Sequence, residues 1–256
     1  MIAGIDIGSR SIELVVLNGE GPPRQVKAPT TFNPLSQCEK LIRETSGITG
    51  FVATGYGRKL FAEKFSDVSV STITEIQAYA MGARFLFPDV QTILDIGGQD
   101  TKVISLAGTG KVMKFEMNDR CAAGTGKFLE FMANALQIPL ESFGEYALGS
   151  DRRIQINSMC TVFAESEATS LMARGERPEN IAMGLHLAIV QRTLAMLKRV
   201  GLSFPFVFAG GVAHNPCVVR LLEEEFGQSF IIPESPDMVG ALGAALYGKN
   251  VVFPAP

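Results

Sequence analysis

Two short segments of the chain place a glycine two positions after an acidic residue, each at the end of a β-branched, apolar run. The first pair is Asp6 and Gly8, and the second is Asp95 and Gly97, 89 residues further on. Glycine lets backbone N–H groups approach phosphate oxygens without a Cβ in the way, and a neighbouring carboxylate can hold Mg²⁺ through water. One such turn is common in hairpins, whereas two in one chain indicate a site for a phosphate and its metal.

The stretches around these pairs, residues 2–17 and 93–104, align without gaps, and each reads as two strands joined by a tight turn. Their spacing exceeds the roughly 50 residues of solenoid repeats, so it predicts a duplicated domain. Strands are expected at residues 51–54 and 204–209, and helices at about residues 35–45, 75–87, 124–136, 161–173, 178–200 and 238–247. Strands and helices that alternate with short links predict an α/β protein.

Composition excludes several classes of protein. The 256 residues carry 23 Lys and Arg against 26 Asp and Glu, and a formal net charge of -3 argues against nucleic acid as a partner. With 46% hydrophobic residues the chain can bury a sizeable core. It has no run near the ~18 consecutive apolar residues of a membrane span, and no basic region precedes an apolar stretch at its start. We therefore expect a soluble, cytoplasmic protein without a membrane partner.

Further residues that could take part in binding or catalysis follow or begin the expected strands and helices. Gly210 and Gly211 come after a buried strand, and Gly240 opens the last helix. Small residues there permit a flat ring to slide between backbone segments, although a tight turn and close helix packing also account for them. Glu75 begins a helix, where a carboxylate complements the macrodipole whether or not it has a catalytic role.

The order of these features resembles the superfamily of actin, Hsp70 and sugar kinases. The resemblance implies two duplicated ribonuclease H-like domains with ATP in the cleft between them. They would span residues 1–90 and 91–256, with the option that a helix at about 238–249 packs back on the first. It also implies that Glu75 positions the attacking water. The implied nucleotide contacts are a first phosphate loop of Asp6, Gly8 and Ser9, a second of Asp95, Gly97, Gly98, Gln99 and Asp100, and an adenosine contact at Gly210 and Gly211.

One motif is a decoy. The run Gly124-Thr125-Gly126-Lys127 looks like the end of a Walker A loop. That pattern requires glycine at position 121 and Ser or Thr at position 128, where this chain has Cys121 and Phe128. We therefore do not interpret the run as a P-loop.

The four cysteines, Cys38, Cys121, Cys160 and Cys217, form no CxxC pair, which excludes a zinc ribbon and a disulfide scaffold. Cys121 and Cys160 each come just before an expected helix, whose unpaired N–H groups favour the metal-binding thiolate. Two thiolates do not complete a four-ligand site. A two-fold dimer would supply four, enough for a [4Fe-4S] cluster shared between subunits. We interpret Cys38 and Cys217 as ordinary thiols.

Five motifs extend the resemblance over nearly the whole chain: 53–58 (ATGYGR), 95–100 (DIGGQD), 117–126 (MNDRCAAGTG), 160–167 (CTVFAESE) and 210–213 (GGVA). Together they resemble the ATP-dependent activators of 2-hydroxyacyl-CoA dehydratases and the related ATPase subunits of benzoyl-CoA reductases. The resemblance implies an ATPase coupled to electron transfer. It would be a homodimer that binds ATP or ADP, Mg²⁺ and one bridging [4Fe-4S] cluster, held by Cys121 and Cys160.

The same resemblance implies the partners and the rest of the site. Reduced ferredoxin or flavodoxin would be the donor, and single low-potential electrons would pass to an iron–sulfur dehydratase, benzoyl-CoA reductase or double-cubane cluster reductase. Such a protein would be oxygen-sensitive and belong to anaerobic metabolism. The implied catalytic residues are Glu75, Asp6 and Asp95, and the nucleotide-binding set also takes in Arg10, Gly124, Thr125, Gly126, Val212 and Gly240.

One position departs from the pattern. Relatives have a lysine at the position of Glu13. In this chain Arg10 could supply positive charge toward a phosphate instead. The alternative function is a small-molecule kinase or a nucleotide-sensing ATPase of the same superfamily without a cluster, which leaves Cys121 and Cys160 unexplained. Of the two histidines, His186 reads as a packed helix residue and His214 as a neighbour of the nucleotide.

Overall fold

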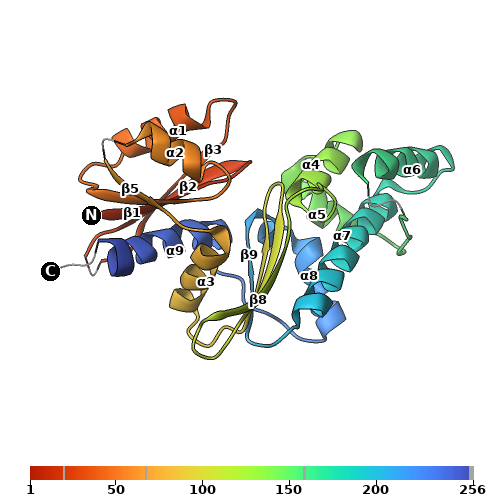
Figure 1. The fold of residues 1–256 in the computed structure, drawn as a ribbon. Coiled ribbons are helices and arrows are strands. Elements are labelled where there is room, and N and C mark those ends of the chain that lie inside the picture. The colour runs from red at the N-terminus through yellow and green to blue at the C-terminus, as the bar shows by residue number, and fades with distance from the viewer. Residues whose placement is uncertain (20, 67, 158–159, 254–256) are drawn as a thin grey trace. The chain divides into compact units, whose positions relative to one another are not determined.

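The computed structural model describes residues 1–19, 21–66, 68–157 and 160–253 (Figure 1). Their contacts divide the chain into two compact units. The first comprises Met1–Ile93, Ile104–Phe115 and Pro233–Pro256, and the second comprises Leu94–Val103 and Glu116–Ile232. The first unit is therefore assembled from three separate stretches of the sequence.

A five-stranded sheet forms the centre of the first unit, in the order β3-β2-β1-β4-β5. Strand β1 runs antiparallel to β2 and parallel to β4. The backbone N–H of Gly8 donates to Ser11 O at 3.0 Å, which closes the predicted hairpin between β1 and β2. The strands are β1 (Ile2–Ile7), β2 (Ser11–Leu17), β3 (Arg24–Pro29), β4 (Gly50–Thr54) and β5 (Ser69–Thr72).

Helices cover both faces of this sheet because strands such as β1 and β4 are buried along nearly their whole length. Helices α1 (Pro34–Arg43) and α2 (Arg58–Lys64) pack on one face, and α9 (Val239–Tyr247) packs on the other (Figure 1). Helix α9 also contacts α3 (Glu75–Leu86) along its length.

Close backbone contacts explain the small residues of α9. A Cβ placed on Gly4 of β1 would lie 2.0 Å from the carbonyl oxygen of Ala241. A Cβ on Gly243 would lie 1.7 Å from Ala78 O in α3. Neither position accepts a side chain, so the glycine cluster that opens the last helix serves to pack α9 against β1 and α3.

The second sheet has the order β8-β7-β6-β9 and confirms the duplication expected from the sequence. Between β6 and β7 the N–H of Gly97 donates to Asp100 O at 2.9 Å, the same turn bond at the aligned positions as in the first hairpin. The strands are β6 (Thr92–Ile96), β7 (Thr101–Leu106), β8 (Val112–Asn118) and β9 (Phe206–Ala209).

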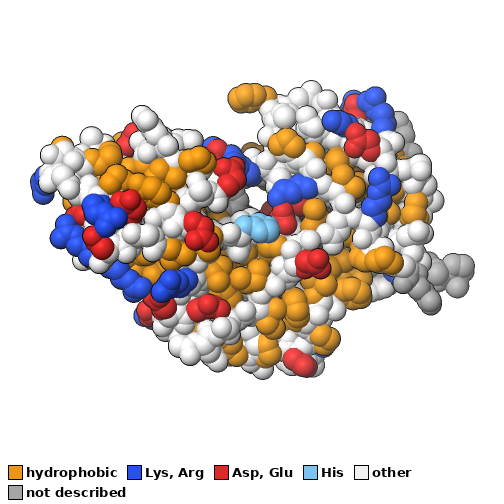
Figure 2. Space-filling model, turned by 180° about the vertical axis from the view of Figure 1, so that it is seen from behind, with side chains coloured by type: hydrophobic (Ala, Val, Ile, Leu, Met, Phe, Trp, Pro, Cys, Tyr) orange, Lys and Arg blue, Asp and Glu red, His pale blue; other side chains and the backbone are white. Residues whose placement is uncertain are grey.

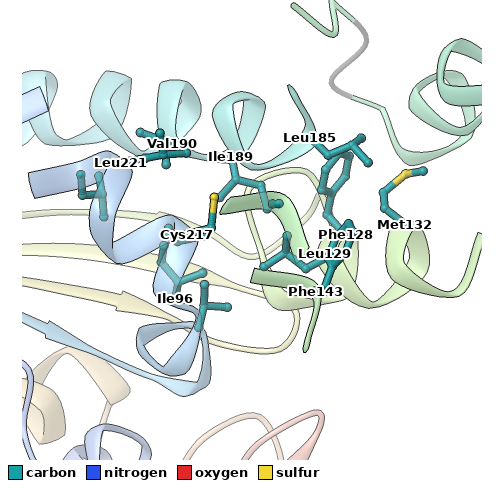
Figure 3. Packing of buried hydrophobic residues seen from close by; sticks show 14 of the residues in the cluster. Ile96, Phe128, Leu129, Met132, Phe143, Leu185, Ile189, Val190, Cys217 and Leu221 are labelled. Carbon is teal, nitrogen blue, oxygen red and sulfur yellow. The ribbon is translucent and has the colours of Figure 1, made fainter. Parts of the chain in front are cut away.

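Helices of the second unit surround one large apolar core, in which Ile96, Phe128 and Phe143 are almost completely buried (Figure 3). Helices 161–173 and 178–200 begin and end as predicted, whereas α4 begins two residues later than predicted. The helices are α4 (Gly126–Ala135), α5 (Leu140–Leu148), α6 (Thr161–Ala173), α7 (Pro178–Val200) and α8 (Pro216–Phe226).

Within the described part of the chain, α7 is the one helix long and apolar enough to cross a membrane by length and composition. However, 72% of its most apolar window is buried inside the protein, which is typical of a core helix. On the face shown in Figure 2, basic and acidic side chains are interspersed among hydrophobic ones rather than separated by sign. That mixture agrees with the small net charge of the sequence.

His186 is a packed residue of α7, as expected. Its Nδ1–H donates to Ala182 O at 2.7 Å, and Asn215 Nδ2 donates to its Nε2 at 3.0 Å, which fixes the neutral tautomer. The amide oxygen of Asn215 accepts from the N–H groups of Cys217 and Val218 and so caps α8. The histidine therefore holds the residue that starts the next helix.

Burial makes the stability of the protein depend on His186 in a defined pH range. It lowers the pKa of this imidazole from 6.5 to about 4. Because the unfolded chain binds this proton near pH 6.5 and the folded protein only near pH 4, stability is full above pH 6.5 and falls as the pH drops toward 4. The contribution is up to about 3 kcal/mol.

We therefore expect the free energy of unfolding in urea to fall less steeply between pH 6.5 and 4 in His186→Gln than in the unmodified protein. The comparison uses the difference in slope, because the substitution also changes stability at neutral pH. Equal slopes in the two proteins would contradict the assignment.

Candidate functional site

The loop after β4 lies directly against the first predicted phosphate loop. Gly55 has a φ of +83°, and a Cβ placed on it would lie 2.3 Å from Asp6 Oδ1 and 2.6 Å from Ile7 O. The N–H of Gly57 donates to Ile7 O at 3.0 Å. Only glycine combines this left-handed conformation with so close an approach, so residue 55 fixes the loop onto the hairpin.

The second unit repeats this contact. Gly210 follows β9 with a φ of +85°, and a Cβ on it would lie 2.3 Å from Asp95 Oδ1 and 2.6 Å from Ile96 O. Asp95 and Ile96 are the aligned counterparts of the residues that face Gly55. The duplication therefore extends beyond the hairpins to the glycine that follows the adjacent strand.

Several residues predicted for the nucleotide are thereby brought together within each unit. In the first unit, a Cβ on Gly240 would lie 2.3 Å from Asp6 Oδ2, so Asp6 is enclosed by two glycine backbones. Ser9 and Arg10 are exposed at the tip of the hairpin. In the second unit Gln99 and Gly211 are exposed, and the neighbouring Val212 is buried.

The start of α4 packs against the second phosphate loop. The N–H of Gly126 donates to Gly97 O at 2.9 Å, and the N–H of Lys127 donates to Gly98 O at 2.7 Å. The Thr101 hydroxyl donates to Gly124 O at 2.6 Å. A Walker A loop directs such amides at a phosphate, whereas here they bind carbonyls of the second loop, which agrees with rejecting that motif.

Lys102 is a site residue that the sequence reasoning missed. It is 2% exposed, and its Nζ lies 2.8 Å from Asp95 Oδ2 and 2.5 Å from Asp100 Oδ2. A lysine on a strand buried on both faces is rare unless it is paired. The repeat contained the signal, because Lys102 aligns with Glu13, the position that departs from the relatives.

The first hairpin has the opposite charge at that position. Glu13 is 5% exposed and lies opposite Asp6 in the antiparallel pairing of β1 with β2. Lys27 on β3 approaches Glu13 Oε1 to 3.8 Å and also pairs with Asp237. The positive charge beside Glu13 is thus supplied by the neighbouring strand β3.

Glu75 is the first residue of α3, whose N-cap Thr74 accepts a hydrogen bond from Gln77 N. Its side chain is 14% exposed, and Arg58 Nη1 lies 3.7 Å from its Oε1. A carboxylate in this first turn complements the helix dipole, as expected. Its distance to Arg58 also links it to the ATGYGR motif.

The four thiols fall into two classes. Cys121 and Cys160 are exposed, whereas Cys38 and Cys217 are buried, and burial raises the pKa of both buried thiols to about 12. Cys160 is the N-cap of α6, as predicted. Cys121 does not directly precede α4 as we expected, because the turn 122–125 separates them; Asn118 Nδ2 instead donates to Cys121 O at 2.9 Å.

Both exposed thiols belong to the second unit. Among the described residues no group of three or more His, Cys, Asp or Glu side chains could hold a metal ion.

Residues 3–248 match the BadF/BadG/BcrA/BcrD ATPase family. The chain belongs to this ATPase family. Its relatives include the 2-hydroxyisocaproyl-CoA dehydratase activator of Clostridioides difficile, 38% identical over 95% of this chain and 93% of the relative. The (R)-2-hydroxyglutaryl-CoA dehydratase activating ATPase of Acidaminococcus fermentans is 37% identical over 95% of both chains.

Solved structures place the fold of this ATPase in the expected class. The Clostridium difficile activator with bound ADPNP superposes with a TM-score of 0.84 at 38% identity, covering 96% of this chain and 93% of that chain. A glucokinase of the ROK family from Streptomyces griseus reaches 0.59 at 15% identity, covering 95% and 97%. The actin, Hsp70 and sugar kinase fold predicted from the sequence is confirmed.

The Lys102 ion pairs lead to a stability prediction for this ATPase. Replacing Lys102 with Met removes the cation between two carboxylates, one of them buried, and we expect the free energy of unfolding to fall by about 3 kcal/mol. Urea unfolding at neutral pH measures the loss. Adding Asp100→Asn to Lys102→Met should recover part of it. An unchanged unfolding midpoint in Lys102→Met would show that the pairs contribute nothing.

Proposed function

We propose that the protein is an ATP-hydrolysing electron-transfer protein that delivers single low-potential electrons to an iron–sulfur partner enzyme. The partner would be of the 2-hydroxyacyl-CoA dehydratase, benzoyl-CoA reductase or double-cubane cluster reductase type. One observation carries the proposal: in a chain of this ATPase family, only the two cysteines that match the predicted ligands are exposed. Named relatives support the partner type, since they activate dehydratases or form part of a benzoyl-CoA reductase.

ATP or ADP is the proposed nucleotide, supported by the bound ADPNP of the similar activator. We assign its phosphates to the two hairpins, where Asp6 and Asp95 would hold Mg²⁺ through water. In this assignment the backbones of Gly8, Gly97, Gly98, Gly124 and Gly126 would contact the phosphates, and Ser9, Arg10, Thr125, Gln99 and Asp100 would add polar side chains. Gly210 and Gly211 would contact adenosine, and Val212 and Gly240 would belong to the same nucleotide-binding set. We keep as part of this proposal two domains of residues 1–90 and 91–256, with the helix at about 238–249 packed back on the first.

Glu75 is the proposed carboxylate that positions the attacking water. Its place in the first turn of α3 holds its carboxylate at the N-terminal end of that helix. A carboxylate held in this way can accept the proton of a water molecule as that water attacks phosphorus.

The proposed cluster site joins two copies of the chain. Cys121 and Cys160 suit a [4Fe-4S] cluster because thiolates are its ligands and two copies supply four. When bound, the cluster supplies a one-electron carrier for electrons from ferredoxin or flavodoxin. The protein's part is to hold these thiols at an accessible surface and to make delivery directional through ATP hydrolysis. Such a protein would work in the anaerobic cytoplasm.

The cluster assignment is tested by iron and acid-labile sulfide on protein purified without oxygen. We expect about four irons per dimer, and loss of that iron in Cys121→Ser and in Cys160→Ser with the fold intact. Cys38→Ala is the matched control and should keep its iron. A full cluster in either serine variant would overturn the ligand assignment.

Thiol alkylation is a second test of the proposed cluster ligands. After removal of iron, the folded protein should react at two cysteines per chain, because the buried pair is protected. Before removal, neither ligand should react. Iron-free protein that still hydrolyses ATP after anaerobic purification would favour the kinase or nucleotide-sensor alternative.

Glu75→Gln tests the hydrolytic step. The amide cannot take a proton, so we expect the rate of ATP hydrolysis to fall at least ~100-fold while ADP affinity is kept. Steady-state hydrolysis and calorimetric ADP titration measure the two quantities. Glu63→Gln, on the exposed surface of α2, is the matched control. Equal hydrolysis rates in Glu75→Gln and the control would remove this residue from the mechanism.

A further inference from the structure

Arg58 makes two contacts that the proposed chemistry has not yet used. It is the first residue of α2 and its side chain is 30% exposed. Its Nη1 donates to Gly55 O at 2.9 Å and lies 3.7 Å from Glu75 Oε1. One guanidinium therefore spans the turn after β4 and the first turn of α3.

The turn that carries Arg58 is itself fixed to the first hairpin. Gly57 N donates to Ile7 O at 3.0 Å, and Gly55 leaves no room for a side chain beside Asp6. Arg58 closes that turn by donating to the carbonyl of Gly55. The position of the guanidinium is thus set by a turn whose backbone contacts the strand that leads into the first predicted phosphate loop.

A capping role does not account for the contact with Glu75. The start of α3 is already capped by Thr74, whose side chain accepts from Gln77 N. Removing Arg58 leaves this cap in place. What it removes is a cation beside the carboxylate that is proposed to align the attacking water.

The chemistry of arginine suits two contacts of this kind. Its guanidinium is planar, keeps its charge and presents five N–H donors in a rigid fork. One edge can stay on a carbonyl while the charge faces a carboxylate. A lysine ammonium is a point charge on a flexible stem, so it would keep the attraction and lose the fixed direction.

We propose that Arg58 is a positioning residue that orients the carboxylate of Glu75 relative to the first phosphate loop. This inference rests on the proposed function, because it requires Glu75 to act on the attacking water. It assigns the arginine of the ATGYGR motif to hydrolysis and not to the nucleotide contacts proposed above.

The test is ATP hydrolysis by Arg58→Ala and Arg58→Lys. We expect kcat to fall roughly 10- to 100-fold in Arg58→Ala, because a carboxylate displaced by about 1 Å loses its alignment, with KM and ADP affinity within about twofold. Arg58→Lys should fall between Arg58→Ala and the unmodified protein. Lys59→Ala, on the exposed side of the same helix, is the control and should hydrolyse ATP at the unmodified rate.

Two further readouts separate positioning from loss of structure. Added guanidinium should restore part of the kcat of Arg58→Ala and none of that of Glu75→Gln. The double variant Arg58→Ala/Glu75→Gln should be no slower than Glu75→Gln alone, since the arginine acts through the carboxylate. Multiplied losses in the double variant would overturn the inference.

The outcomes also distinguish this inference from the function on which it rests. An unmodified rate in Arg58→Ala beside a slow Glu75→Gln would overturn the role of Arg58 and keep that of Glu75. An unmodified rate in Glu75→Gln would remove both. A slow Arg58→Ala that guanidinium rescues, beside a slow Glu75→Gln, supports both.

Discussion

The contact between a left-handed glycine and an aspartate carboxylate occurs twice in this chain, and each half is arranged around it. Gly55 faces Asp6 and Gly210 faces Asp95, and in both places a Cβ would lie 2.3 Å from the carboxylate oxygen. The contact holds the loop after one strand against the hairpin that begins with the adjacent strand of the sheet. The residues of that loop therefore lie close to the end of the hairpin.

The two halves use the same contact for different purposes. In the first unit the loop continues into Arg58 and so reaches Glu75 at the start of α3. In the second unit it continues into Gly211–His214, a short 3₁₀ turn that ends at the Asn215 cap of α8. The same backbone geometry is thus followed by Arg58 and α2 in the first unit and by a short 3₁₀ turn and α8 in the second. Duplication has preserved the frame while the attached side chains have diverged.

Local signals in the sequence predicted much of this arrangement. The hairpins, the glycine turns and the long helices α6 and α7 are determined by residues close together in the chain. Local sequence patterns therefore predict them. Strand β3 and helix α5 were not predicted, because their apolar patterns are short and do not identify a strand or a helix without the contacts they make in the fold. The offset of Cys121 from α4 depends on a turn whose bonds reach back to Asn118.

The unpredicted site residues share one property, which is that their burial or their partners depend on other elements of the fold. Lys102 pairs across its own hairpin, but its burial follows only from the sheet around it. Lys27 balances Glu13 from a different strand, and Arg58 meets Glu75 from a different helix. Charge compensation of this kind has no fixed spacing in sequence. The change of charge between the aligned residues Glu13 and Lys102 was visible in the sequence. The residues that balance each charge were not.

The return of α9 to the first sheet has a consequence for the way the protein folds. Gly4 and Ala241 meet backbone to backbone, although Gly4 is translated long before Ala241. Until α9 emerges from the ribosome, one apolar face of β1, β2 and β4 stays uncovered, while all of the second unit has already been made. Contacts so distant in sequence form slowly, because a long loop must close before they stabilise anything. Of the two units, the one whose translation begins first is thus completed last, and its bare sheet is open to aggregation or to a chaperone during synthesis.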